Sequence, residues 1–138
     1  MNALRPILAL AALAAAGAAL GDGKALPLAL KGYDPVSYFT EQRPAKGVST
    51  VAYDFDDTRY LFASAKNKER FAADPERYSP QFTGLCTTGL SMGMKAEANP
   101  EVYLVKDGKL YVFSSPQARD MAIQDPSVFE RARQNFGK

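Results

Sequence analysis

The side chains of this sequence best suited to chemistry are sulfur-containing and lie in one short segment. Residues 82–94 read FTGLCTTGLSMGM and contain Cys86, the only cysteine of the chain, followed by Met92 and Met94. One thiolate and two thioethers form a ligand set that suits Cu(I), and the lack of histidine argues against zinc. Cys86, Met92 and Met94 are therefore a candidate metal site. Methionine and cysteine are also common core residues, which is the competing interpretation.

Cys86 could instead be a reactive thiol. Reactivity requires a thiol pKa lowered by a nearby cation, a helix N-terminus or a histidine. The chain has no histidine, and Lys95 is the only base close in sequence. No second cysteine is present to resolve an oxidised thiol, so a thiol enzyme is disfavoured, while an intermolecular disulfide stays open.

A third interpretation places a binding loop at residues 83–99. This stretch is rich in glycine, serine and threonine and lacks clear periodicity. Binding loops commonly have these properties, and Thr87, Thr88 and Ser91 could orient a small polar group. An ordinary structured connection is the alternative.

The carboxylates of the sequence do not form a recognisable catalytic pattern. Asp34, in a turn before Pro35, is expected to cap backbone amides. No acidic residue is paired with a second functional group in the manner of general acid–base catalysis, so enzymatic activity is not expected.

These residues must be positioned by an internally repeated scaffold. Residues 51–78 align without gaps to residues 102–129, a shift of 51 positions. Each copy predicts a β-hairpin, with strands at 51–55 and 59–63 in the first and at 102–106 and 109–114 in the second. Ser64 and Ser115 are then placed to cap a helix, and Pro116 to open one. A further helix is predicted from Asp125 to about Asn135.

The aromatic residues of the repeat predict its core. They fall on one face of each strand or helix, as buried side chains do. This set comprises Tyr60, Phe62, Phe71, Tyr78, Tyr111, Phe113 and Phe129. The expected fold class is therefore α+β, a small single domain of two β-hairpin-plus-helix units.

The N-terminal residues indicate the location of the protein, and its net charge bears on its partners. Residues 1–21 contain one basic residue, Arg5, and then an uncharged apolar run at 7–20, which is typical of a secretory signal peptide. We expect a mature domain at residues 22–138 that is periplasmic or secreted and has no membrane segment. The formal net charge of +2 gives no reason to expect a nucleic acid partner.

Residues 32–39 and 60–78 contain two motifs that together resemble a known family, the YHS domain. GYDPVSYF (residues 32–39) and YLFASAKNKERFAADPERY (residues 60–78) are similar to the exported bacterial branch of this family, which is related to the TRASH metal-binding domains. The resemblance covers residues 30–113. It implies metal handling, often of copper, or an accessory role beside another periplasmic protein.

This sequence lacks the cysteine ligands of the metal-binding members of that family. The positions that carry cysteine ligands in metal-binding members are occupied here by Ser37, Ala63 and Asn67. None of these side chains can replace a thiolate for a soft metal ion. A metal site would have to be a different one, built on Cys86, and a module that binds a non-metal ligand or a partner is the alternative.

Overall fold

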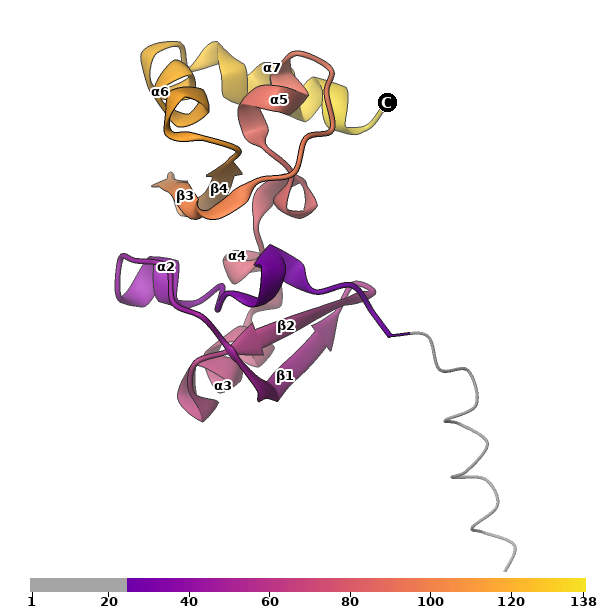
Figure 1. The fold of residues 1–138 in the computed structure, drawn as a ribbon, viewed down its shortest axis with the longest axis vertical. Coiled ribbons are helices and arrows are strands. Elements are labelled where there is room, and N and C mark those ends of the chain that lie inside the picture. Colours follow the sequence, from indigo (N-terminus) through magenta and orange to yellow (C-terminus); the bar gives the residue numbers. More distant parts are fainter. Residues whose placement is uncertain (1–24) are drawn as a thin grey trace, which may run out of the picture.

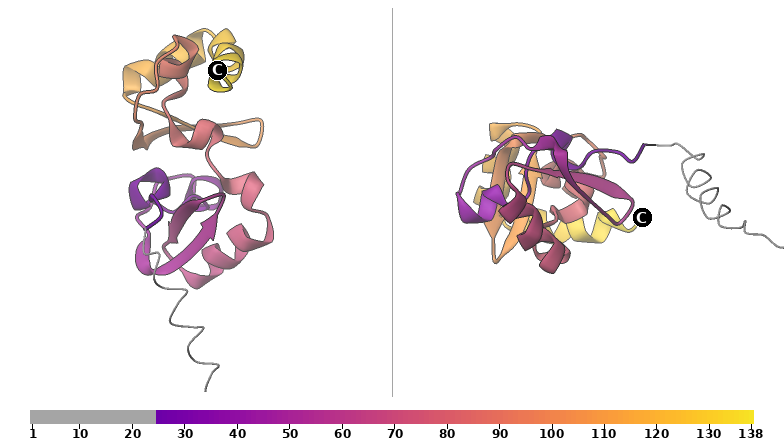
Figure 2. Two further views of the ribbon diagram at one scale, coloured as in Figure 1. Left: turned by 90° about the vertical axis from the view of Figure 1, so that its right-hand side faces the viewer. Right: turned by 90° about the horizontal axis from the view of Figure 1, so that it is seen from below.

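The chain forms a single α+β domain in which two structurally similar units are stacked along the long axis (Figure 1). The computed structural model describes residues 25–138, so the predicted signal peptide at 1–21 lies outside the described residues. Figure 2 shows the units from two further sides, with the chain passing from α4 of the first into the second. None of the helices described is long and apolar enough to cross a membrane.

The elements follow the same order in both units, each counted from a 3₁₀ turn (η). The first unit contains η1 (Ala29–Gly32), α2 (Ser37–Thr40), β1 (Val48–Phe55), β2 (Thr58–Phe62), α3 (Ala65–Ala73) and α4 (Pro75–Tyr78). The second contains η2 (Gln81–Gly84), α5 (Thr87–Ser91), β3 (Asn99–Lys106), β4 (Lys109–Phe113), α6 (Pro116–Gln124) and α7 (Ser127–Phe136).

The two predicted hairpins are confirmed, and they share one irregularity. Each is an antiparallel pair with a bulge in its first strand, between Val48 and Ala52 in β1 and between Asn99 and Tyr103 in β3. Both turns use two residues with positive φ, and Gly108 supplies one of them. That conformation matches the twist of the flanking strands.

The helices begin where the sequence predicted. Ser64 accepts a hydrogen bond from Asn67 N, and Ser115 accepts one from Ala118 N, both at 3.1 Å. Each hydroxyl pairs one of the amides that a helix N-terminus leaves free. Pro116 occupies the first turn of α6, and α7 ends at Phe136, one residue beyond the predicted end.

The structural repeat is longer than the sequence repeat. Ahead of the hairpins, Gly84 follows Gly32 by 52 positions, whereas Val102 follows Val51 by 51. The second unit therefore has one residue fewer between its 3₁₀ turn and its first strand. A gap-free alignment cannot cross that deletion, so the sequence repeat does not include the 3₁₀ turns and the short helices that follow them.

Three buried clusters form the core of residues 25–138. All seven aromatic residues predicted to be core are buried, which confirms that prediction. In the first unit, Phe71 packs its ring against four others, with centroids 4.5 to 6.0 Å apart. The third cluster joins the units, and it contains Leu30 and Tyr38 from the first unit and Ala98, Leu110 and Val112 from the second.

Candidate functional site

A fully buried carboxylate, that of Asp34, organises the first unit. Its Oδ1 accepts a hydrogen bond from Val36 N, and its Oδ2 accepts from Ala63 N and Asn67 Nδ2, all at 2.8 Å. Ser37 Oγ donates to the backbone oxygen of Asp34 at 3.0 Å. The predicted amide cap is thus confirmed. Buried carboxylates require such donors. The three donors come from the start of α2, the end of β2 and α3, so the Asp34 carboxylate joins these elements.

The three positions at which the family resemblance implies cysteine lie around this carboxylate. Ser37, Ala63 and Asn67 are separated along the chain, yet each makes a hydrogen bond to Asp34. Both carboxylate oxygens of Asp34 already accept hydrogen bonds from N–H groups. None of the side chains around this carboxylate is a soft metal ligand. The arrangement therefore serves as a structural hydrogen-bond network and offers no thiolate to a soft metal ion.

Cys86 is the counterpart of Asp34 in the second unit, 52 positions further along. Its Sγ accepts hydrogen bonds from Gly89 N at 3.4 Å and Ser114 N at 3.2 Å, and it donates to Ser114 Oγ at 3.5 Å. Ser114 corresponds to Ala63 in the repeat. The thiol is only 1% exposed and packs in the core of the second unit. It therefore caps α5, while Asp34 at the equivalent position accepts from Val36 N in the turn that leads into α2.

The structure places the three candidate sulfur ligands in different environments. Cys86 is buried, whereas Met92 and Met94 are 55% and 51% exposed. Within residues 25–138, no three histidine, cysteine, aspartate or glutamate side chains come together as a metal site would require. A Cu(I) site on Cys86, Met92 and Met94 stays a prediction, and it would require both thioethers to turn inward toward a thiol that already has three partners.

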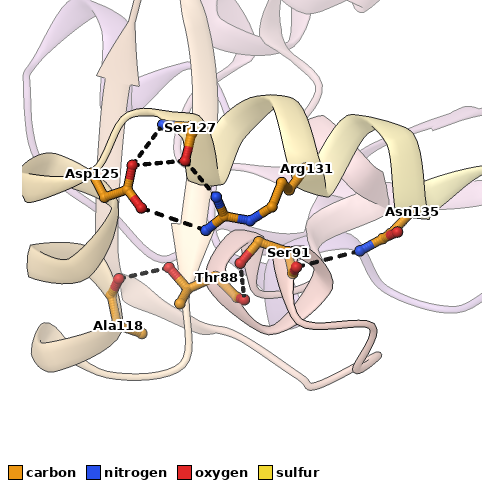
Figure 3. A network of polar contacts seen from close by, with 7 residues as sticks. All are labelled: Thr88, Ser91, Ala118, Asp125, Ser127, Arg131 and Asn135. Carbon is orange, nitrogen blue, oxygen red and sulfur yellow. Dashed lines mark hydrogen bonds and ion pairs between the residues drawn. The ribbon is translucent and has the colours of Figure 1, made fainter.

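The hydroxyls of Thr87, Thr88 and Ser91 are buried, so they are not placed to orient a ligand as the sequence suggested. Thr88 Oγ1 donates to Ala118 O at 2.6 Å, and Ser91 Oγ donates to Thr88 O at 2.6 Å. Asn135 Nδ2 on α7 donates to the backbone oxygen of Ser91 (Figure 3) and to that of Leu90. These contacts attach α5 to α6 and α7, and the hydroxyls satisfy backbone groups instead of facing a ligand. Thr87 is also fully buried, and its Oγ1 has no hydrogen-bond partner among residues 25–138.

Asp125 fixes the start of α7 on the outside of the same unit. Its Oδ1 accepts from Ser127 N and Ser127 Oγ, and Arg131 lies 3.6 Å from Oδ2 (Figure 3). The hydrogen bonds from Ser127, supported by the charge of Arg131, lower the pKa of Asp125 below its ordinary value. This exposed carboxylate holds the turn that leads into α7.

A cleft of about 310 Å³ lies where the two units meet. Its walls come from the segments around η1 and η2 and from the start of β3. Two charged residues, Lys31 and Glu97, lie on it, and their Nζ and Oε1 atoms are 3.3 Å apart. Its apolar lining consists of Leu28, Leu30, Leu85, Ala98 and Pro100.

The cleft is flanked by unusual backbone. Leu30 and Lys31 in η1, and Phe82 and Thr83 in η2, all have φ between 51° and 58°. Non-glycine residues rarely adopt this left-handed conformation, which costs about 1–2 kcal/mol for each residue. Such strain is retained where the surrounding structure determines it and is commonly found at ligand sites. Part of the cleft lining, including Thr83, Leu85 and Glu97, belongs to the stretch 83–99 in which the sequence predicted a binding loop. The wall from the first unit was not predicted, because no local motif marks it.

The chain matches no protein-family model, no curated protein and no solved structure. The similarity to the YHS domain therefore stays a prediction that rests on the two motifs.

Proposed function

We propose that this chain is an exported, YHS-like binding protein that takes a small organic ligand in the cleft between its two units. The observation that carries the proposal is the cleft itself, whose walls come from both units. Ligand pockets in proteins have volumes of roughly 300–1,000 Å³ and combine an apolar lining with a few polar groups. The cleft is at the lower end of that range and has this composition.

The alternative, copper handling, has less support from the geometry. Ser37, Ala63 and Asn67 cannot supply thiolates, and the thiol of Cys86 is enclosed in the core. Burial also removes this thiol from soluble reactants, which weighs against a reactive-thiol function. A ligand-binding module could also act as an accessory to another periplasmic protein. The proposal that the protein is exported is based on the signal-like residues 1–21.

Thermal-shift measurements on the purified mature domain test the proposal. The compounds are free amino acids, short-chain carboxylates, short-chain amines and monosaccharides, with Cu(I) under a competing chelator as a separate arm. We expect at least one organic compound to raise the melting temperature, because a ligand that binds only the folded state stabilises it.

Two matched variants locate the binding. Leu28 lines the cleft and is 50% exposed, and Val48 lies elsewhere and is 47% exposed. Leu28→Trp should narrow the cleft and remove the shift, while Val48→Trp should keep it. The proposal is wrong if no compound stabilises the protein or if both variants respond alike. A stoichiometric Cu(I) site that disappears in Cys86→Ser would support the copper alternative instead.

A further inference from the structure

The cleft has opposite charges on its two walls. Lys31 comes from the first unit and Glu97 from the second, and both side chains are exposed. Water screens such a pair, so it adds little to folding stability and can open at small cost. A ligand that supplies its own carboxylate and ammonium can therefore replace each partner of the pair.

The short separation of the two charges selects among ligands. Because the Nζ of Lys31 and the Oε1 of Glu97 lie only 3.3 Å apart, they favour a molecule whose ammonium and carboxylate are attached to one carbon over a peptide with charges at its two distant ends. A molecule with only a carboxylate would meet the like charge of Glu97. A molecule with only an amine would meet that of Lys31. These like-charge contacts lower the affinity for ligands with a single charge and so contribute to specificity.

The remaining lining selects the rest of the ligand. Leu30, Leu85 and Ala98 present aliphatic groups, with no aromatic side chain among the lining residues. A volume of about 310 Å³ accommodates a molecule of amino-acid size and is small for a nucleotide. Burial of an aliphatic side chain there would supply the hydrophobic contribution to binding.

We infer that the ligand is a free α-amino acid with an aliphatic side chain. Its carboxylate contacts Lys31, its ammonium contacts Glu97, and its side chain enters the apolar part of the cleft. This inference rests on the proposed function and names the ligand class of the same cleft.

Calorimetric titration of the mature domain with four related compounds tests the inference. L-Leucine carries all three recognised groups, glycine lacks the side chain, 4-methylpentanoate lacks the ammonium, and 3-methylbutylamine lacks the carboxylate. We expect leucine to bind at least about tenfold more tightly than each of the others, because each lacks one interaction. Equal binding of glycine and leucine, or tighter binding of either singly charged compound, would overturn the inference.

Charge variants give a signature that loss of structure would not produce. Lys31→Gln and Glu97→Gln should each weaken leucine binding about tenfold, the size of one lost charged hydrogen bond. Glu97→Gln should also improve binding of 4-methylpentanoate, and Lys31→Gln that of 3-methylbutylamine, because each removes a repulsion. Lys106→Gln is the matched control, since Lys106 forms an exposed ion pair with Asp107 at the far end of β3.

The failures of the two ideas can be distinguished. If leucine does not bind but another compound stabilises the wild type and not Leu28→Trp, the amino-acid inference is wrong and the binding proposal stands. If nothing binds in the cleft, both are wrong. Unchanged selectivity in Lys31→Gln and Glu97→Gln would contradict the assigned contacts even if leucine binds.

Discussion

The same structural position is occupied by a carboxylate in one unit and by a thiol in the other. Asp34 and Cys86 each accept one backbone N–H group from two or three residues further on and another from the residue that follows the second hairpin strand. The carboxylate binds these donors at 2.8 Å, while the larger and less polar sulfur accepts them at 3.2 and 3.4 Å. The role of Cys86 that the structure shows is therefore structural, a helix cap enclosed in the core.

Asp34→Asn should destabilise the protein by about 1–3 kcal/mol, the cost of leaving a buried polar group unpaired. The amide has one oxygen, so its nitrogen must face a backbone N–H that now donates to the carboxylate. Chemical denaturation followed by circular dichroism measures the change. Asp57→Asn at the exposed hairpin turn is the control, and an equal stability of the two variants would contradict this role for Asp34.

At the scale of elements, each unit is a 3₁₀ turn, a short helix, a bulged hairpin and a capped helix. The elements are local, but the side chains that join them come from distant parts of the sequence. Ala63 and Asn67 reach Asp34 from about thirty positions away because the end of the first hairpin and the start of α3 pack against the turn before α2. Ala63 lies at the surface, and Ser37 and Asn67 are buried, so a ligand at this place would be accessible from one side.

The triple variant Ser37→Cys, Ala63→Cys, Asn67→Cys should acquire a soft-metal site. Three thiolates brought to one place can bind Zn²⁺ or Cu(I), with water or another group completing the coordination of zinc. Competition with a chromophoric chelator measures the affinity. The double variant Ser37→Cys, Ala63→Cys should bind at least about tenfold more weakly, because it lacks one ligand. A triple variant that takes up no more metal than the wild type would count against the YHS resemblance.

At the scale of the whole molecule, the two units share a cluster and a buried hydrogen bond. Tyr38 Oη in the first unit donates to Pro100 O in the second at 2.7 Å. Burial raises the pKa of Tyr38 above its ordinary value, so this hydroxyl keeps its proton. Each unit has a buried cluster of its own, and the third cluster joins them, so we expect the two to unfold together.

Tyr38→Phe should lower the free energy of unfolding by about 1–2 kcal/mol, because Pro100 O loses its buried donor. Circular dichroism and tyrosine fluorescence should report one coincident transition in both proteins, as in two-state unfolding. Tyr33→Phe is the control, since its hydroxyl donates to Glu101 at an exposed position and should contribute little. Two separate transitions in the wild type would show that the units fold independently.

The sequence by itself determined the local architecture of this protein. Hairpin turns, serine caps and the spacing of the aromatic residues act over a few positions, so the elements from β1 to α4 and from β3 to α7 could be predicted. Tertiary structure alone decided what those elements bring together. A one-residue deletion in the second unit hid the equivalence of Cys86 with Asp34 in the sequence. The burial of Thr87, Thr88 and Ser91 depends on how α6 and α7 cover α5. The cleft likewise exists only because η1 and η2 meet across the two units, where packing between residues more than fifty positions apart determines the shape.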